Sequence, residues 1–195
     1  MQDSLPVKTV TKVIGLESVD STQNVAKELA LAGEPEGTLV LACTQTSGRG
    51  RYDRRFDSGH GGVYFTLILR PQKLAACNAS LSVRAGEAVA DTITALFGLK
   101  TKIKLPNDVL VWDSARRQWK KVCGILIETS ALDSSDEWVL VGIGVNVNNS
   151  LSPALRQTAT SLKQLLGKKI DKEMFLEELL ERFWKHYTYW LMSCR

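Results

Sequence analysis

Residues 38–69, TLVLACTQTSGRGRYDRRFDSGHGGVYFTLIL, contain two apolar stretches separated by a loop rich in glycine and arginine. The stretches at residues 38–44 and 63–69 are rich in β-branched and aliphatic side chains and have glycines nearby, a pattern typical of strands. The segment between them, residues 45–62, is polar. We therefore predict two strands joined by a charged loop.

Helical spacing follows on either side of this pair. Ser21 and Thr22 offer N-cap side chains before an apolar pattern that runs to Leu31, so a helix is expected there. Apolar residues at spacings of three and four predict a long helix at residues 79–97, ending at Gly98, and another from about Lys172 onward. Three short apolar runs, at residues 109–112, 122–128 and 138–147, predict a meander of strands.

These elements predict an α/β (α+β) fold, with a mixed β-sheet flanked by helices, because strands and helices interleave while adjacent strands also form hairpins. The chain has 195 residues and shows no linker or repeat. A single domain over residues 1–195 is therefore expected.

Composition excludes several classes of protein. The longest apolar runs are far short of the roughly 20 residues that cross a bilayer, and the first 14 residues lack the apolar core of a secretory signal, which favours the cytoplasm. The 4 cysteines form no CxxC pair, so neither a zinc site nor a disulfide framework is indicated. The formal net charge is +4, and part of the excess lies in residues 49–55.

The glycine and arginine loop, residues 45–56 (QTSGRGRYDRRF), has the composition of an anion-binding loop. Glycines let the backbone approach a ligand, and guanidiniums pair bidentately with phosphate or carboxylate. We therefore expect this loop to bind a polyanion. Taken alone, the loop is explained as well by a solvated arginine-rich turn or a nucleic-acid patch.

Three further segments place polar groups beside predicted strands. Residues 104–108, KLPND, set a lysine, an amide and a carboxylate at a strand entrance, where they could order ATP phosphates and magnesium, although this is also common turn chemistry. Lys121 begins the strand KVCGILIE and could neutralise a substrate carboxylate, or it could be a surface lysine. Residues 142–146, GIGVN, could be a bulged strand without a ligand.

Taken together and in order, these segments resemble the catalytic domain of the biotin protein ligase family, whose fold is related to that of class II aminoacyl-tRNA synthetases. That family carries a Ser-Thr pair before its first helix, a Gly-Arg-Gly-Arg loop, a Lys-Trp-Pro-Asn-Asp segment, a Lys-x-x-Gly-Ile-Leu strand and a Gly-x-Gly-x-Asn strand. The matching segments are residues 21–23, 48–58, 104–108, 121–126 and 142–146. Gln23 stands in place of asparagine, and Leu105 and Phe56 in place of tryptophans.

The resemblance implies that the chain activates biotin with ATP, giving biotinyl-5′-AMP, and transfers biotin to a lysine of a biotin carboxyl carrier protein or domain, with Mg²⁺ as cofactor. It implies catalytic roles for Lys121, Arg49 and Arg51. The residues that it implies for biotin are Ser21, Thr22, Gln23, Gln45, Gly48, Arg49, Gly50, Arg51, Lys121, Gly124, Gly142 and Gly144. Those that it implies for ATP are Arg51, Arg54, Phe56, Lys104, Asn107, Asp108 and Asn146, with Asp108 also binding magnesium.

Within that set, the family pattern implies finer roles. Ser21, Thr22 and Gln45 would hydrogen-bond the ureido group and neighbouring parts of biotin. Gly124 and the strand at residues 142–144 would let the biotin ring lie close to the backbone. Phe56 would pack on adenine as the loop folds over the nucleotide.

The sequence leaves rival activities and partners open. A lipoate ligase or octanoyl transferase would share the fold, although residues 104–108 and 121–126 match the biotin branch better. A nucleic-acid module built on the arginine loop would need a series of stacking aromatics, which is lacking near it. Neither an N-terminal helix-turn-helix nor a C-terminal SH3-like domain is expected, so no DNA partner is predicted. A homodimer is expected by analogy.

Overall fold

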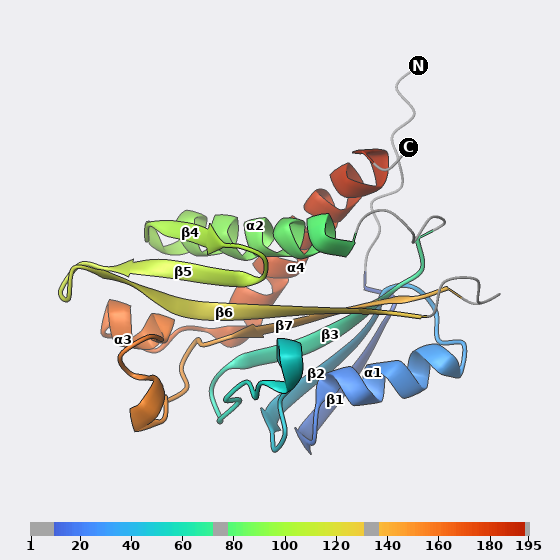
Figure 1. The fold of residues 1–195 in the computed structure, drawn as a ribbon, viewed down its shortest axis with the longest axis horizontal. Coiled ribbons are helices and arrows are strands. Elements are labelled where there is room, and N and C mark those ends of the chain that lie inside the picture. The colour runs from blue at the N-terminus through green and yellow to red at the C-terminus, as the bar shows by residue number, and fades with distance from the viewer. Residues whose placement is uncertain (1–9, 72–77, 131–136, 194–195) are drawn as a thin grey trace.

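The computed structural model describes residues 10–71, 78–130 and 137–193. In these ranges the chain forms a mixed seven-stranded sheet in the order β1-β2-β3-β7-β6-β5-β4 (Figure 1). The strands are β1 (Lys12–Val19), β2 (Thr38–Gln45), β3 (Val63–Leu69), β4 (Thr101–Lys104), β5 (Asp108–Asp113), β6 (Gln118–Thr129) and β7 (Val139–Val145). The β1 and β2 strands pair in parallel, and the other described neighbours pair antiparallel.

Helices cover both faces of this sheet. Figure 1 shows α2 (Asn78–Phe97) and α4 (Lys172–Ser193) on one side and α1 (Thr22–Leu31) on the other. The larger apolar core lies under α2 and α4, and a smaller one lies under α1. Three short elements complete the described chain: α3 (Leu162–Leu166) and the 3-10 turns η1 (Arg51–Asp53) and η2 (Pro153–Leu155).

Strand β3 contributes side chains to both cores. Phe65 and Leu67 belong to the core under α2 and α4, whereas Ile68 belongs to the core under α1. Because side chains alternate along a strand, Thr66 lies on the same face as Ile68. We call this side of the sheet the α1 face.

The predicted mixed sheet with flanking helices is confirmed, and β5, β6 and β7 are the predicted meander. The elements β1, β4 and α3 were not predicted from the sequence. Two of these are edge strands with largely exposed side chains, and α3 has 5 residues, so their apolar patterns are weak. None of the helices within the described ranges combines the length and apolar character that crossing a bilayer requires.

Candidate active site

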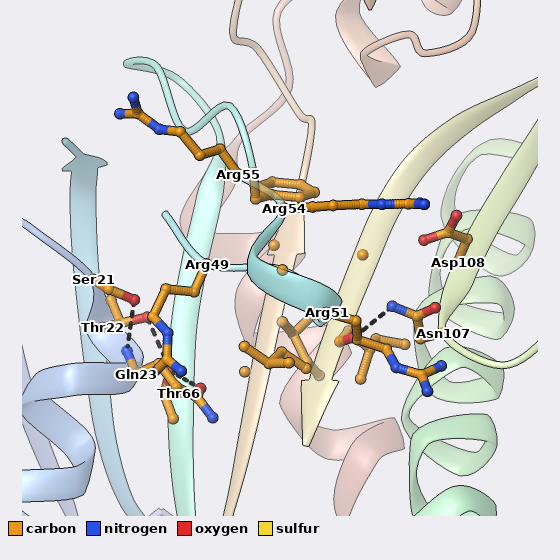
Figure 2. Close-up of a pocket in the computed structure, with 18 of the residues that line it drawn as sticks. Ser21, Thr22, Gln23, Arg49, Arg51, Arg54, Arg55, Thr66, Asn107 and Asp108 are labelled. Atoms are coloured by element: carbon orange, nitrogen blue, oxygen red, sulfur yellow. Dashed lines mark hydrogen bonds between the residues drawn. The ribbon is translucent and has the colours of Figure 1, made fainter. Parts of the chain in front are cut away.

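A cleft of about 300 Å³ opens on the α1 face, among the start of α1, the arginine loop, the 104–108 turn and the middle of β3, β6 and β7. The structure brings most of the predicted site residues together around it (Figure 2). Those that line the cleft are Ser21, Thr22, Gln23, Gln45, Arg49, Gly50, Arg51, Arg54, Phe56, Lys104, Asn107, Asp108, Lys121, Gly124, Gly142 and Gly144. They come from segments more than 100 residues apart, so the cleft is a product of the sheet order.

One end of the cleft is a buried polar floor built on the first turn of α1. Ser21 is the N-cap, and its hydroxyl oxygen accepts the Gln23 N–H at 3.3 Å. Thr22 donates its N–H to Gln45 Oε1 at 2.8 Å, and Gln45 Nε2 donates to Ser58 Oγ at 2.8 Å. Thr66 Oγ1 lies 2.9 Å from Thr22 Oγ1. Polar groups removed from water need such partners, so these bonds hold the floor in one arrangement.

Asp20 fixes the entrance to α1 just outside this floor. Its side chain accepts hydrogen bonds from Asn24 Nδ2 and from the Ser21 N–H, each at 2.6 Å. The hydrogen bond from Asn24, followed by that from Ser21, lowers the pKa of Asp20 below its ordinary value. Asp20 therefore stays ionised at neutral pH beside the start of the helix, where negative charge is favourable.

The glycines on β6 and β7 leave room for other groups against the sheet. A Cβ on Gly142 would lie 2.5 Å from Gln23 Oε1, and a Cβ on Gly144 would lie 2.7 Å from the Phe56 ring. A Cβ on Gly124 would lie 3.0 Å from the same ring. Phe56 thus lies against the glycine backbone, in the space where the sequence analysis placed the biotin ring. Its stacking on adenine stays a prediction.

The arginine loop is held together by its own backbone. Phe56 donates its N–H to the Gly48 carbonyl at 2.8 Å, and Gly50 donates to the Arg54 carbonyl at 2.7 Å. Tyr52 at the tip has a left-handed φ of 56° and is 80% exposed. A Cβ on Gly48 would lie 2.5 Å from both the Phe56 carbonyl oxygen and Ser58 Oγ, so this glycine serves packing in the loop and does not line the cleft.

The two arginines with implied catalytic roles, Arg49 and Arg51, have different surroundings. Arg49 pairs with Glu128 on β6 through two hydrogen bonds, at 2.8 and 3.2 Å, and also donates to Asn24 Oδ1 at 3.1 Å. Arg51 bonds the neighbouring Tyr52 hydroxyl at 3.1 Å, beside the cleft. In this structure Arg49 therefore ties the loop to α1 and β6, and Arg51 is the more available cation.

Lys121 reaches the cleft because β6 contains a bulge. Leu110 and Val109 on β5 pair with Lys121 and Cys123, so Val122 is an extra residue in the ladder. Strict alternation would put Lys121 on the sheet face opposite Gly124; the bulge puts both on the α1 face. The Lys121 ammonium then lies 2.6 Å from Asp108 Oδ1.

The 104–108 turn supports this pair. Asn107 donates its side-chain amide to the Ile125 carbonyl at 3.0 Å and accepts the Ile125 N–H on its own carbonyl at 2.9 Å. Asn107 thus fixes the turn to β6, while Lys104 and Leu105 are exposed at the rim. Leu105, which is 70% exposed, precedes a cis peptide bond to Pro106.

Asn146, which the resemblance implies for ATP, lies apart from the cleft lining. This residue is buried and is not among the described residues that line the cleft. Its Oδ1 accepts a hydrogen bond from Asn149 at 3.0 Å, and its backbone bonds Val122 and Leu162. Asn146 therefore joins the end of β7 to β6 and to the start of α3. The physical reason is its position past the end of β7, where it caps backbone groups.

A magnesium ion in the cleft would need oxygen ligands from a substrate as well as from the protein. Within the described ranges no group of three His, Cys, Asp or Glu side chains could hold a metal ion. Asp108 is a single carboxylate already paired with Lys121. This donor set suits Mg²⁺ bound through one carboxylate and phosphate oxygens, which is the usual arrangement for that ion beside a nucleotide.

Several residues that build this site are not predicted by the sequence patterns. Thr66 and Glu128 are the most important, since they bond Gln23 and Arg49. Thr66 could have been noticed in the sequence, because it is a polar residue between the stretches VYF and LIL of a largely apolar strand. Buried polar groups need partners. No feature of the sequence pointed to Glu128, because its partner lies 79 residues away.

The chain is similar in sequence to known proteins. A model of the biotin/lipoate A/B protein ligase family matches residues 15–148. The bifunctional ligase/repressor BirA of Bacillus subtilis (strain 168) is 42% identical over 173 residues, which cover 87% of this chain and 51% of that protein. The biotin--[acetyl-CoA-carboxylase] ligase of Paracoccus denitrificans is 37% identical over 174 residues, covering 86% of this chain and 70% of that protein.

A solved structure is similar as well. The biotin protein ligase from Aquifex aeolicus in complex with biotin and ATP superposes with a TM-score of 0.77 and 32% sequence identity, over 91% of this chain and 71% of that one. The chain spans about half the length of the BirA relatives that it matches.

Proposed function

Because the chain belongs to the biotin/lipoate A/B protein ligase family, we propose that it is a biotin protein ligase, which activates biotin with ATP and attaches it to a lysine of a biotin carboxyl carrier domain. The names of the relatives and the biotin and ATP complex of the Aquifex protein support this substrate pair. The observation that carries the proposal is one cleft that holds the buried Gln23 and the partly buried Gln45 together with the ammonium of Lys121.

The first step joins two anions. An oxygen of the biotin carboxylate attacks the α-phosphorus of ATP, the bond to the β-phosphate oxygen breaks, and biotinyl-5′-AMP and pyrophosphate form. Negative charge builds on the α-phosphate oxygens as the new bond forms. Lys121 and Arg51 supply positive charge at the cleft, and preorganised charge of this kind usually contributes more to catalysis than any other single effect.

The second step uses the mixed anhydride. The neutral amine of the carrier lysine attacks the biotinyl carbonyl carbon, an amide bond forms, the carbon–oxygen bond to AMP breaks, and the nitrogen loses a proton. Lys121 serves this step too, because the departing AMP carries the same phosphate oxygens. The arginine loop covers this part of the cleft and limits hydrolysis of the adenylate.

Magnesium binding falls to Asp108, with Lys104 and Arg54 at the rim of the cleft for the outer phosphates. When bound, the ion would neutralise phosphate charge. Because Asp108 also pairs with Lys121, the same carboxylate orients the ammonium.

The strongest rival within the family is lipoate or octanoate activation. Those acids end in a dithiolane ring or a methyl group, which offer almost nothing to a buried polar floor. A cyclic urea offers a carbonyl oxygen and two N–H groups. A site with buried hydrogen-bonding groups rejects analogues that leave those groups unpaired, which favours biotin.

Exchange of labelled pyrophosphate into ATP tests the proposal, because it reports the first step and needs no acceptor protein. With magnesium present, biotin should support exchange, while lipoate and octanoate should not. Exchange with lipoate or octanoate instead of biotin would move the chain to the other branch of the family. The carrier partner would then be tested by mass spectrometry of a carrier domain incubated with biotin and ATP.

Several expectations from the sequence stay predictions. They are a single catalytic domain over residues 1–195, a cytoplasmic location, a homodimer, and the lack of a DNA partner. Among the relatives, BirA is named as both a ligase and a repressor.

A further inference from the structure

Thr66 is a buried hydroxyl residue in the middle of β3. All seven residues of β3 are buried, and Thr66 itself is 0% exposed. Its Oγ1 lies 3.1 Å from Gln23 Oε1 and 2.9 Å from Thr22 Oγ1, so it joins two residues of the first turn of α1 (Figure 2). A buried hydroxyl lowers the stability of the fold unless its hydrogen bonds are made. These two contacts therefore matter for stability, and they also determine which group donates each proton.

The direction of the protons follows from donor counting. Gln23 Oε1 can only accept, so Thr66 commits its single proton to it. The short contact between Thr66 and Thr22 must then be donated by Thr22, whose alternative acceptor, Gln45 Oε1, is further away at 3.2 Å. Gln45 Oε1 keeps the Thr22 backbone N–H at 2.8 Å. Thr22 therefore donates to Thr66, and Thr66 donates to Gln23.

These two hydrogen bonds fix which end of the Gln23 amide faces the cleft. Gln23 Oε1 accepts from Thr66 and lies over the Gly142 backbone, where a Cβ would come within 2.5 Å of it. Gln23 is 3% exposed and lines the cleft, and its Nε2 has no hydrogen-bond partner within the described part of the chain. The buried amide therefore presents N–H groups that a ligand must satisfy.

Ser21, which lines the same cleft, adds a second donor. Its hydroxyl oxygen accepts the Gln23 N–H at 3.3 Å, which leaves the hydroxyl proton available. Two donors in one cleft match a carbonyl oxygen, which has two lone pairs. In the cyclic urea of biotin that oxygen stands opposite the ring carrying the acid chain.

We infer that Thr66 is a specificity-determining positioning residue: by accepting from Thr22 and donating to Gln23, it holds the Gln23 amide with its NH₂ toward the ligand, and so selects a carbonyl oxygen at that position. The inference rests on the proposed biotin ligase function. Thr66 acts through Gln23, and it makes the site reject a ligand that carries N–H groups where biotin carries its urea oxygen.

The analogue 2-iminobiotin provides the test, because an imino nitrogen replaces the urea oxygen while the rest of the molecule is unchanged. Dissociation constants for biotin and 2-iminobiotin would be measured by calorimetry on the wild-type chain and on Thr66→Val, Thr66→Ser and Thr92→Val. Thr92 is the matched control, since its buried hydroxyl bonds Ala88 within α2, away from the cleft.

Wild type should prefer biotin. Thr66→Val removes the donor to Gln23 Oε1, so the amide can turn its oxygen toward the cleft, and the preference for biotin over 2-iminobiotin should fall on the order of tenfold. Thr66→Ser and Thr92→Val should keep the wild-type preference. Gln23→Glu, which presents only oxygens, should lower the preference in the same direction even if Thr66→Val folds poorly.

An equal loss of affinity for both ligands in Thr66→Val, with the preference unchanged in Gln23→Glu, would overturn the inference, because that is the result of loosened packing alone. Failure of the wild-type chain to bind either ligand would instead overturn the proposed function. The two failures are therefore separate.

Discussion

The Lys121 ammonium and the Asp108 carboxylate form an ion pair, Nζ to Oδ1 2.6 Å, between neighbouring strands of the sheet. Both side chains are partly buried, 33% and 22% exposed, and both line the cleft. The pair exists because the bulge at Val122 turns Lys121 onto the face that Asp108 occupies. A cation in this position is held toward the cleft before any substrate arrives.

Replacing Lys121 with alanine should lower the rate of biotin-dependent pyrophosphate release on the order of a hundredfold or more, the scale seen when one donor to a developing oxyanion is lost. Lys121→Arg should recover part of the rate, because arginine restores the positive charge but carries it on a planar guanidinium instead of an ammonium group. Lys185→Ala, which removes an exposed lysine paired with Glu181 on α4, is the control. Equal rates for Lys121→Ala and wild type would refute the catalytic role.

Replacing Asp108 with asparagine should slow adenylate formation roughly tenfold or more, because a charge-assisted bond that orients Lys121 is lost. The magnesium concentration needed for half-maximal rate should rise as well, since the proposed metal carboxylate is gone. The measurement is a magnesium titration of pyrophosphate exchange. A lower rate with an unchanged magnesium requirement would leave Asp108 only the positioning of Lys121.

Replacing Glu128 with glutamine should loosen the arginine loop without unfolding the chain. The Arg49–Glu128 pair is 39% and 25% exposed, so its loss should cost at most about 1 kcal/mol of unfolding free energy. The amides of Gly50 and Phe56, which close the loop, should exchange with deuterium faster. Glu181→Gln breaks an exposed pair on α4 and should leave these amides unchanged. Identical exchange in Glu128→Gln would mean that the pair does not hold the loop.

Replacing Gly142 with alanine should weaken biotin binding on the order of tenfold or more, because the new Cβ would lie 2.5 Å from Gln23 Oε1 and must displace that buried amide. Gly15→Ala is the matched control: Gly15 is also in a strand, and a Cβ on Gly15 would have nothing within 4 Å. Calorimetric titration with biotin compares the two. Similar affinities in both variants would contradict the close approach at Gly142.

Acid should remove the contribution of Asp113 to stability. Burial raises the pKa of this carboxyl, but hydrogen bonds from the Arg116 N–H and guanidinium outweigh it, so the pKa in the folded chain lies below the ordinary value of 3.8. A lowered folded pKa contributes stability that is present above 3.8 and is lost as the pH falls through the folded value. Asp113→Asn should therefore be less stable than wild type at pH 7, and the difference should shrink on acidification.

Urea unfolding at neutral and acidic pH measures that difference. A gap between wild type and Asp113→Asn that does not change with pH would show that the carboxylate charge contributes nothing.

Much of the site could be predicted from the sequence because its parts are local. The N-cap Ser21, the glycines of the arginine loop and the order of the five segments are short-range features, and each has a local physical signature. The core helices and the central strands also follow from periodicity. Asn146 lies apart from the other residues implied for ATP, because a residue just past a strand end bonds neighbouring segments that the sequence does not reveal.

The sequence by itself determined the elements and the chemical groups: two core strands around a cationic loop, a lysine at the head of a strand, and glycines where a ring can approach. Only the tertiary structure decided how they meet. It set β7 between β3 and β6, turned Lys121 toward Asp108 through one extra residue, and joined Thr66 to Gln23 and Glu128 to Arg49. The reason is that a bulge or a hydrogen bond between residues tens of positions apart depends on strand order and register, which no local pattern encodes.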